Sequence, residues 1–185
     1  MRLRIDWRSK YDFVGNFNEG FAPVELDDKH GFVNAKGEEI VPLKYDNVRD
    51  FHDGLAQVNL NHHWGFINTK GEEVVPLKYD DAWLFFNGYV KVKLKRKWGV
   101  VNEKGEEVVP LKYDWVENFY DGFAGVQING EWGLVNEKGE EVVPLKFTEE
   151  ETLEIPRGAD LLSFKMGISK EEALKLIIEE MKKRK

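Results

Sequence analysis

The chain has 185 residues, of which 42% are hydrophobic and 33% charged, a composition typical of a soluble globular protein rather than a disordered one. It contains no cysteine, which excludes disulfides, thiolate nucleophiles and cysteine-based metal sites. The formal net charge of −7 disfavours general nucleic-acid binding, and an aromatic content of 13% together with 17 glycines favours short strands and tight turns.

In chain order, the first predicted segment is a degenerate N-terminal strand over residues 1–9. Repeated units follow, marked by glycines that are 34 residues apart: Gly31, Gly65, Gly99 and Gly133. The units run over residues 10–43, 44–77, 78–111 and 112–145, with a partial fifth unit over 146–157. A fixed period of this length predicts a tandem-repeat architecture, in which each unit needs its neighbours for stability.

Each unit is predicted to contain four short strands. In the second unit these are expected over residues 45–51, 55–61, 64–68 and 73–75. Asp53-Gly54 predicts a tight hairpin turn, because glycine accepts the positive φ that such a turn requires. Pro76 is expected to end the fourth strand, because proline has no backbone donor for the ladder.

A tryptophan and a tyrosine each recur at the 34-residue spacing, and they are predicted to form the core rather than a ligand site. A unit of this size cannot bury both these aromatics and its Val/Ile/Leu face, so a neighbouring unit is expected to supply the missing wall. In the first unit His30 takes the tryptophan position, as expected for an atypical terminal repeat. The predicted structural core residues are Trp64, Trp98, Trp132, Tyr45, Tyr79 and Tyr113.

The motif that begins at Trp98-Gly99 and runs through Val108-Val109-Pro110 to Asp114, followed by residues 119–124, resembles the WG-repeat family. The resemblance covers about residues 10–155 and implies a β-rich tandem repeat, with no general activity attached to the family. The units are also unusually alike, which fits recent duplication as well as a consensus-like or designed member of the family, because consensus repeats are readily designable.

The final segment, residues 158–185, is predicted to contain a capping helix. Ser169 and Glu172 form a capping-box pattern at its start. An apolar stripe follows at helical spacing and is expected to cover the last repeat, with partner binding as the alternative: Leu174, Ile177, Ile178 and Met181.

The predicted fold class is therefore an all-β tandem repeat of four-stranded, 34-residue units in an open, solenoid-like array with a C-terminal helical cap. The alternative is a closed ring resembling a five-bladed propeller, in which the N-terminal strand and residues 146–157 complete one unit. Contact between Ile5 and residues 147–153 would indicate the ring.

No nucleophile elbow, phosphate-binding loop or metal-ligand spacing is present in the sequence, so we expect no enzyme activity, no cofactor and no metal site. We also expect no nucleic-acid or membrane partner, a monomer, and a cytoplasmic location. The predicted function is a non-catalytic scaffold or binding module for a protein or peptide. The alternative is a designed or consensus repeat protein with no evolved ligand.

Function in repeat proteins is expected where the units differ. Stepping through the units shows aromatic residues in the third and fourth units at positions that are mostly polar in the others. If these side chains face solvent they form a binding patch, and if they face the C-terminal helix they form its docking site. The candidate partner-binding residues are Trp83, Phe86, Trp115 and Tyr120.

Overall fold

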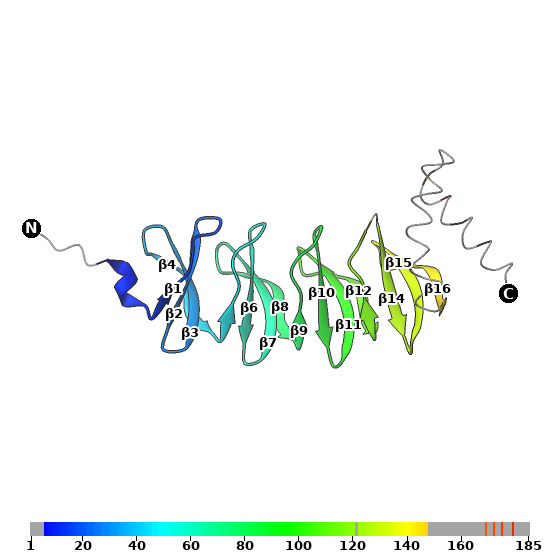
Figure 1. The fold of residues 1–185 in the computed structure, drawn as a ribbon, viewed down its shortest axis with the longest axis horizontal. Coiled ribbons are helices and arrows are strands. Elements are labelled where there is room, and N and C mark those ends of the chain that lie inside the picture. Colours follow the sequence, from blue (N-terminus) through cyan, green and yellow to red (C-terminus); the bar gives the residue numbers. More distant parts are fainter. Residues whose placement is uncertain are drawn as a thin grey trace, which may run out of the picture. The chain divides into compact units, whose positions relative to one another are not determined.

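The computed structural model describes residues 6–120 and 122–147, together with Ser169, Glu172, Lys175 and Glu179. A short 3₁₀ helix, η1 (Trp7–Lys10), comes first, and sixteen strands follow (Figure 1). The first eight strands are β1 (Phe13–Val14), β2 (Phe21–Leu26), β3 (Lys29–Asn34), β4 (Glu39–Tyr45), β5 (Asn47–Val48), β6 (Leu55–Leu60), β7 (His63–Asn68) and β8 (Glu73–Tyr79). The other eight are β9 (Asp81–Ala82), β10 (Tyr89–Leu94), β11 (Lys97–Asn102), β12 (Glu107–Tyr113), β13 (Trp115–Val116), β14 (Phe123–Ile128), β15 (Glu131–Asn136) and β16 (Glu141–Phe147).

The strands form four separate four-stranded sheets, β1–β4, β5–β8, β9–β12 and β13–β16, in which neighbours along the chain are neighbours in the sheet. These sheets are the first to fourth repeats, and the pairings described within them are antiparallel. None of the described sheets is closed on itself, and the predicted class of tandem four-stranded β-repeats is confirmed. The contact that would indicate the alternative five-bladed ring involves Ile5, which lies outside the described residues.

By its internal contacts the chain divides into two compact units. The first contains residues 1–96 and 101–106, and therefore the first two sheets with β9 and β10. The second contains residues 97–100 and 107–185, and therefore β12 and the fourth sheet.

The first and fourth strands of a repeat differ most from the sequence prediction. In the second repeat the fourth strand continues through Pro76 to Tyr79, and the first strand shrinks to Asn47–Val48. Pro76 is tolerated because β8 is an edge strand, where a missing N–H breaks no ladder. The pairing of β7 with β8 also shifts register around Phe66, which loops the strand outward near the proline.

This bulge explains why a glycine follows each tryptophan position. A Cβ on Gly65 would lie 2.6 Å from the carbonyl oxygen of Val75 and 2.9 Å from the amide nitrogen of Leu77. Backbone atoms cannot move away as a flexible side chain could, so any larger residue would displace strand β8. The same backbone contact recurs at Gly31, Gly99 and Gly133.

The core of the first compact unit lies between consecutive sheets. Phe51, which follows β5 in the second repeat, is 1% exposed. Its ring centroid lies 4.9 Å from that of Phe21 and 4.7 Å from that of Phe32, both in the first repeat. The pattern recurs one step on, where Phe85 of the third repeat packs at 4.8 Å against Phe66 of the second. Within this unit, consecutive repeats therefore bury apolar side chains against each other, as the sequence predicts.

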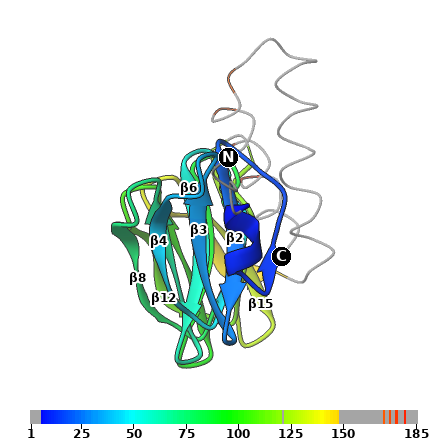
Figure 2. The ribbon, with the colours of Figure 1, turned by 90° about the vertical axis from the view of Figure 1, so that its left-hand side faces the viewer.

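Residues 7–10 form a 3₁₀ helix where the sequence predicts the end of a strand. Figure 2 shows η1 in front of β2, on the outer face of the first sheet. Trp7 packs against the apolar cluster of that face and lies where a Cβ on Gly37 would be. Its ring is also 6.4 Å from that of Phe17, and it lies beside Gly37 as Val41 lies beside Gly71 of the second repeat. The Trp7 indole thus covers part of the outer apolar cluster of the first sheet.

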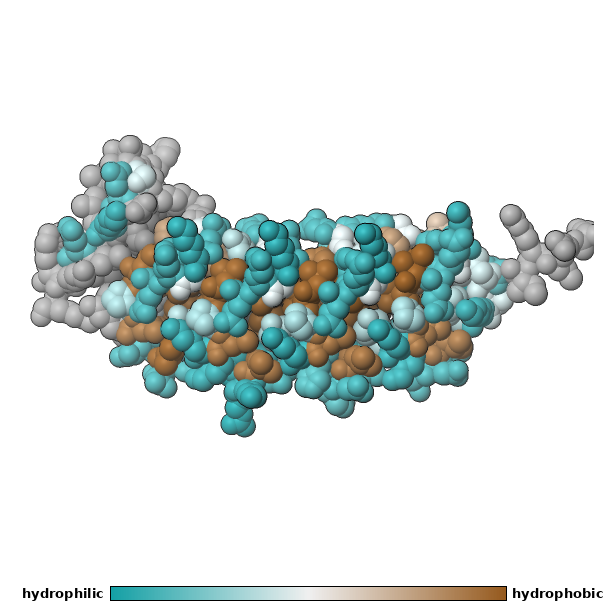
Figure 3. All heavy atoms as spheres, turned by 180° about the vertical axis from the view of Figure 1, so that it is seen from behind, coloured by the Kyte–Doolittle hydropathy of each residue, from teal (hydrophilic) through white to brown (hydrophobic). Residues whose placement is uncertain are grey.

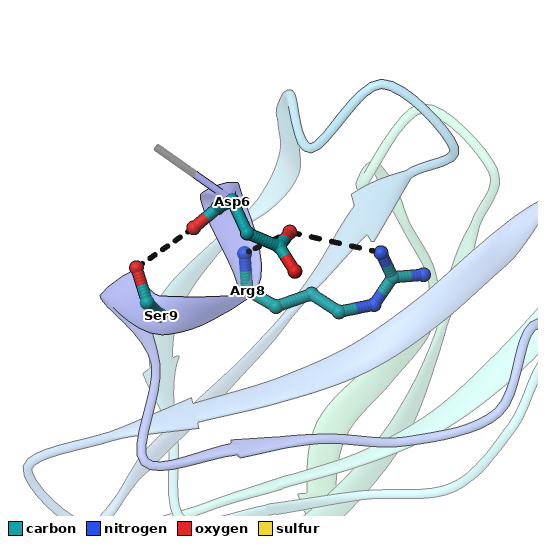
Figure 4. Close-up of polar contacts among 3 residues, drawn as sticks. All are labelled: Asp6, Arg8 and Ser9. Atoms are coloured by element: carbon teal, nitrogen blue, oxygen red, sulfur yellow. Dashed lines mark hydrogen bonds and ion pairs between the residues drawn. The ribbon is translucent and has the colours of Figure 1, made fainter. Parts of the chain in front are cut away.

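The first turn of η1 is held by local polar contacts, drawn in Figure 4. The Asp6 carboxylate accepts a hydrogen bond from the Arg8 amide at 3.2 Å, and the Ser9 hydroxyl donates to the Asp6 carbonyl at 2.7 Å. Because all three residues are exposed, these contacts shape the helix more than they stabilise the protein.

Of the predicted C-terminal helix the structure describes only the four isolated residues named above. Their capping box is formed: the Glu172 amide donates to the Ser169 hydroxyl at 3.2 Å, and Glu172 Oε2 accepts from the Ser169 amide at 3.0 Å. The apolar stripe of the helix and its predicted contact with the last repeat lie outside the described residues.

Candidate interaction surface on the third repeat

The recurring aromatic residues belong to the scaffold. Tyr45, Tyr79 and Tyr113 are at most 2% exposed, and Trp98 and Trp132 are also buried. Trp64 is half-buried and pairs across the sheet with Tyr79, as His30 pairs with Tyr45 in the first repeat. The guanidinium of Arg49 lies 5.8 Å from the Trp64 ring. These side chains fill the space between sheets and leave little surface for a ligand.

The four candidate partner-binding residues fall into two pairs that lie in different compact units. Trp83 and Phe86 lie on the segment between β9 and β10, where they are 44% and 39% exposed. Trp115 and Tyr120 lie on the corresponding segment of the fourth repeat, where Tyr120 is 57% exposed and Trp115 is half-buried. Trp115 is anchored there, since its ring packs at 5.5 Å on Trp98 and its Nε1 donates to Glu117 at 2.7 Å.

Leu84, which is not among the sequence-based candidates, is 51% exposed beside Trp83. We call Trp83, Leu84 and Phe86 the apolar segment. At the position of Leu84 the other repeats carry Asn16, Asp50 and Asn118. The same 34-residue step that singled out its neighbours would have found it, because it is the one apolar residue in a polar column.

The backbone of the apolar segment is the same as in the other repeats. The Trp83 amide donates to the carbonyl of Lys91 at 3.0 Å, and the Phe86 amide donates to the carbonyl of Tyr89 at 2.8 Å. The equivalent bonds elsewhere are Gly15 to Pro23, Arg49 to Gln57 and Glu117 to Gly125, at 2.8–2.9 Å. Polar and apolar sequences therefore support one conformation, and the exposed apolar side chains are not needed to form it.

Lys91 fixes the orientation of Trp83. The lysine is only 4% exposed, and its Nζ lies 3.8 Å from the centroid of the Trp83 ring. A cation held against an indole face in a desolvated position is worth about 2 kcal/mol. The other repeats have Pro23, Gln57 and Gly125 at this position. Trp83 is therefore presented to solvent on a fixed support.

The apolar segment is particular to the third repeat, whereas part of the remaining apolar surface recurs from repeat to repeat. Figure 3 shows this recurrence on the opposite side of the molecule from Figure 1, where apolar areas alternate with oblique hydrophilic bands. Because that pattern repeats with the sequence, it reflects the scaffold and does not distinguish one repeat from another.

The carboxyl groups of Asp46 and Asp114 have lowered pKa values, and both belong to the scaffold. A hydrogen bond from Lys29 at 2.6 Å, followed by one from the Asn61 amide, lowers the pKa of Asp46. Lys97 and the Asn129 amide lower the pKa of Asp114 in the same way. These carboxylates tie the turn between the second and third strands to the first strand of a repeat.

The repeated glutamates are likewise bound within their turns. Glu72 Oε2 accepts a hydrogen bond from the Asn68 amide group at 2.7 Å, and the three other repeats have the same bond at 2.6–2.8 Å. In the part of the chain that the structure describes, no group of three or more His, Asp or Glu side chains is arranged to hold a metal ion. No described helix is long and apolar enough to cross a membrane.

Solved structures that resemble the chain are distant. A Kluyveromyces lactis Hsv2 with loop 6CD replaced by a Gly-Ser linker is 11% identical, and the match covers 66% of this chain and 47% of that one, with a TM-score of 0.41. A Saccharomyces cerevisiae dbp5 complex with nup159, gle1, ip6 and adp is 9% identical over 81% of this chain and 49% of that one, with a TM-score of 0.40. The chain thus spans about half the length of these structures.

No curated protein matches the chain. The family model of the WG containing repeat matches residues 9–29, 31–61, 64–98, 98–132 and 132–149, which together are well over half of the sequence. These matches span the four sheets and include each glycine over which the fourth strand bulges. The chain therefore belongs to the family of proteins built from the WG containing repeat.

Proposed function

We propose that this chain is a non-catalytic binding scaffold, and that the apolar segment of its third repeat is where a protein or peptide partner binds. The observation that carries the proposal is the exposure of Trp83, Leu84 and Phe86 on a backbone that three other repeats build with mostly polar residues. Neighbouring exposed apolar side chains mark interaction surfaces when folding does not require them.

A non-catalytic role is supported by the chemistry of the repeated acids. Catalytic acid–base pairs need two carboxyl groups in different environments. The recurring Glu38, Glu72, Glu106 and Glu140 share one environment, each accepting from the asparagine four residues before it.

Site-specific photo-crosslinking tests the proposal. A benzophenone amino acid replaces Leu84 in one variant and Asp50, the equivalent exposed residue of the second repeat, in a matched control. We expect a defined crosslinked product in cell lysate from position 84 and none from position 50. Excess unlabelled wild-type protein should suppress this product, whereas the double variant Leu84→Asn/Phe86→Asn should not. Identical products from both positions, or none from position 84, would overturn the proposed surface.

A further inference from the structure

A row of basic side chains distinguishes the third repeat from the others as clearly as its apolar segment does. Strand β10 and the turn after it carry four cationic residues at positions where no other repeat has a lysine or an arginine: Lys91, Lys93, Lys95 and Arg96. The equivalent residues are Pro23, Glu25, Asp27 and Asp28 in the first repeat and Gln57, Asn59, Asn61 and His62 in the second. In a chain with a net charge of −7, this local excess of cations is unusual.

The basic row begins at the apolar segment. The Trp83 amide is hydrogen-bonded to the Lys91 carbonyl, and Asp81 lies opposite Lys93 two residues further along the two strands, beyond the buried pair Ala82 and Val92. The Lys95 amide then donates to the Asp80 carboxylate at 2.7 Å. Lys95 follows Lys91 by four residues, which is a length of about 13 Å in extended chain. The surface is therefore one continuous strip, apolar at one end and basic at the other.

Exposure increases along this strip. Lys91 is buried beneath Trp83, Lys93 is half-buried, and Lys95 and Arg96 are exposed in the turn. Asp80 and Asp81 offset part of the charge and leave the strip positive. The cations near the turn are thus placed to meet an opposite charge on a partner, whereas Lys91 supports the tryptophan.

We propose, building on the proposed function, that the partner binds this strip through an acidic segment that carries an apolar anchor residue. The anchor packs on Trp83, Leu84 and Phe86, where burial of apolar area supplies most of the affinity. Carboxylates of the same segment lie along Lys93, Lys95 and Arg96, where charge complementarity sets orientation and increases the association rate. An extended segment of about five residues spans the strip.

A protein segment fits this strip better than an anionic bilayer does. The Glu103 carboxylate lies beside the turn that follows Phe86, with Oε1 3.4 Å from where a Cβ on Gly88 would be. Asp80 and Asp81 lie beside the basic residues, where Asp81 is opposite Lys93 and the Asp80 carboxylate accepts from the Lys95 amide. A flat anionic surface would meet these carboxylates and be repelled by them. A single extended segment can place its own acidic side chains beside the lysines and avoid the carboxylates.

The test is a random peptide library of about 12 residues, long enough to span the strip when extended. The library is selected on the wild-type protein after depletion on the Leu84→Asn/Phe86→Asn variant, which carries the asparagines of the first repeat at both positions. The proposal expects enriched peptides with an excess of Asp and Glu around at least one large apolar residue. Their affinity should fall as salt rises, because the charges on the turn are exposed.

A charge variant separates this inference from the proposed function. The triple variant Lys93→Asn/Lys95→Asn/Arg96→His carries the residues of the second repeat and keeps the apolar segment. It should bind the enriched peptides about tenfold more weakly than the wild type. Enriched peptides that are neutral or basic, or that bind this variant equally well, would overturn the acidic partner and leave the apolar surface standing.

Two further results would overturn the proposals in other ways. If depletion on the apolar variant removes every binding peptide, the apolar segment is not a binding surface and both proposals fail. Vesicles of phosphatidylcholine with phosphatidylserine are the last probe, and we expect no association. Binding of the wild type to these vesicles, lost in the triple variant, would overturn the acidic segment in favour of a membrane.

Discussion

The second and third repeats have the same backbone hydrogen bonds between their first two strands but present opposite surfaces there. The second repeat carries Arg49, Asp50 and His52, whereas the third carries Trp83, Leu84 and Phe86 on the same path. The conformation thus depends on positions that both repeats share, such as the buried aromatics and the glycine beneath the bulge. Side chains on this edge are free to change without altering the fold, which is how one repeat of an array can acquire a partner.

The largest effect is expected at a shared position. Phe51→Ala should reduce the free energy of unfolding by about 4 kcal/mol, because it leaves a cavity between Phe21 and Phe32. Phe17, the equivalent residue of the first repeat, is 39% exposed, and Phe17→Ala should cost less than about 2 kcal/mol. Urea unfolding followed by tryptophan fluorescence measures both. Equal losses would show that the buried contact between the first two repeats adds nothing.

A somewhat smaller effect is expected at the glycine beneath the bulge. Gly65→Ala should cost about 3 kcal/mol, because its Cβ would meet the backbone of strand β8. Gly54→Ala is the matched control: its φ is +76°, but nothing lies within 4 Å of the added carbon, so only the backbone strain of about 1 kcal/mol remains. Comparable unfolding midpoints for the two variants would contradict the packing explanation of the motif.

The smallest effect concerns pH. The hydrogen bond from Lys29, and then that from the Asn61 amide, lowers the pKa of Asp46 below its ordinary value of 3.8. A carboxylate with a lowered pKa in the folded state stabilises the protein fully above 3.8 and loses this contribution as pH falls through its folded-state pKa. Asp46→Asn should therefore be less stable than wild type near pH 7, and the difference should shrink as the pH falls below 3.8. A stability difference that persists undiminished in acid would refute this assignment.

Much of the repeat can be predicted from the sequence, because its period and its turn residues are local signals. The turn at Asp53-Gly54 forms with both residues at positive φ, and the two middle strands lie within a residue of their predicted ranges. The extension of the fourth strand through Pro76 depends on its being at the sheet edge, which a local pattern does not contain. The 3₁₀ helix at Trp7 likewise involves a tertiary contact, since the indole packs beside Gly37 and on the outer apolar cluster of the first sheet.

The candidate surface is predictable only in part. Stepping through the repeats identifies Trp83 and Phe86 as different from their counterparts, but the same signal selects Trp115, whose ring is held against Trp98 and Glu117. Comparing the repeats shows that a residue varies, but its exposure depends on how its neighbours pack around it. The support that Lys91 gives Trp83 depends on a cross-strand contact and becomes visible only in three dimensions.

The central claim, that side chains of the third repeat and not the shared scaffold bind the partner, is tested most directly by one set of affinities. Fluorescence anisotropy with an enriched acidic peptide compares wild type, Leu84→Asn/Phe86→Asn and Phe13→Asn. Phe13 is an exposed aromatic of the first repeat, and asparagine is its counterpart in the second. We expect the double variant to bind about thirtyfold more weakly, from about 1 kcal/mol per lost apolar contact, with an unchanged unfolding midpoint. Phe13→Asn should bind as the wild type does; equal weakening by both variants, or none by the double variant, would contradict the claim.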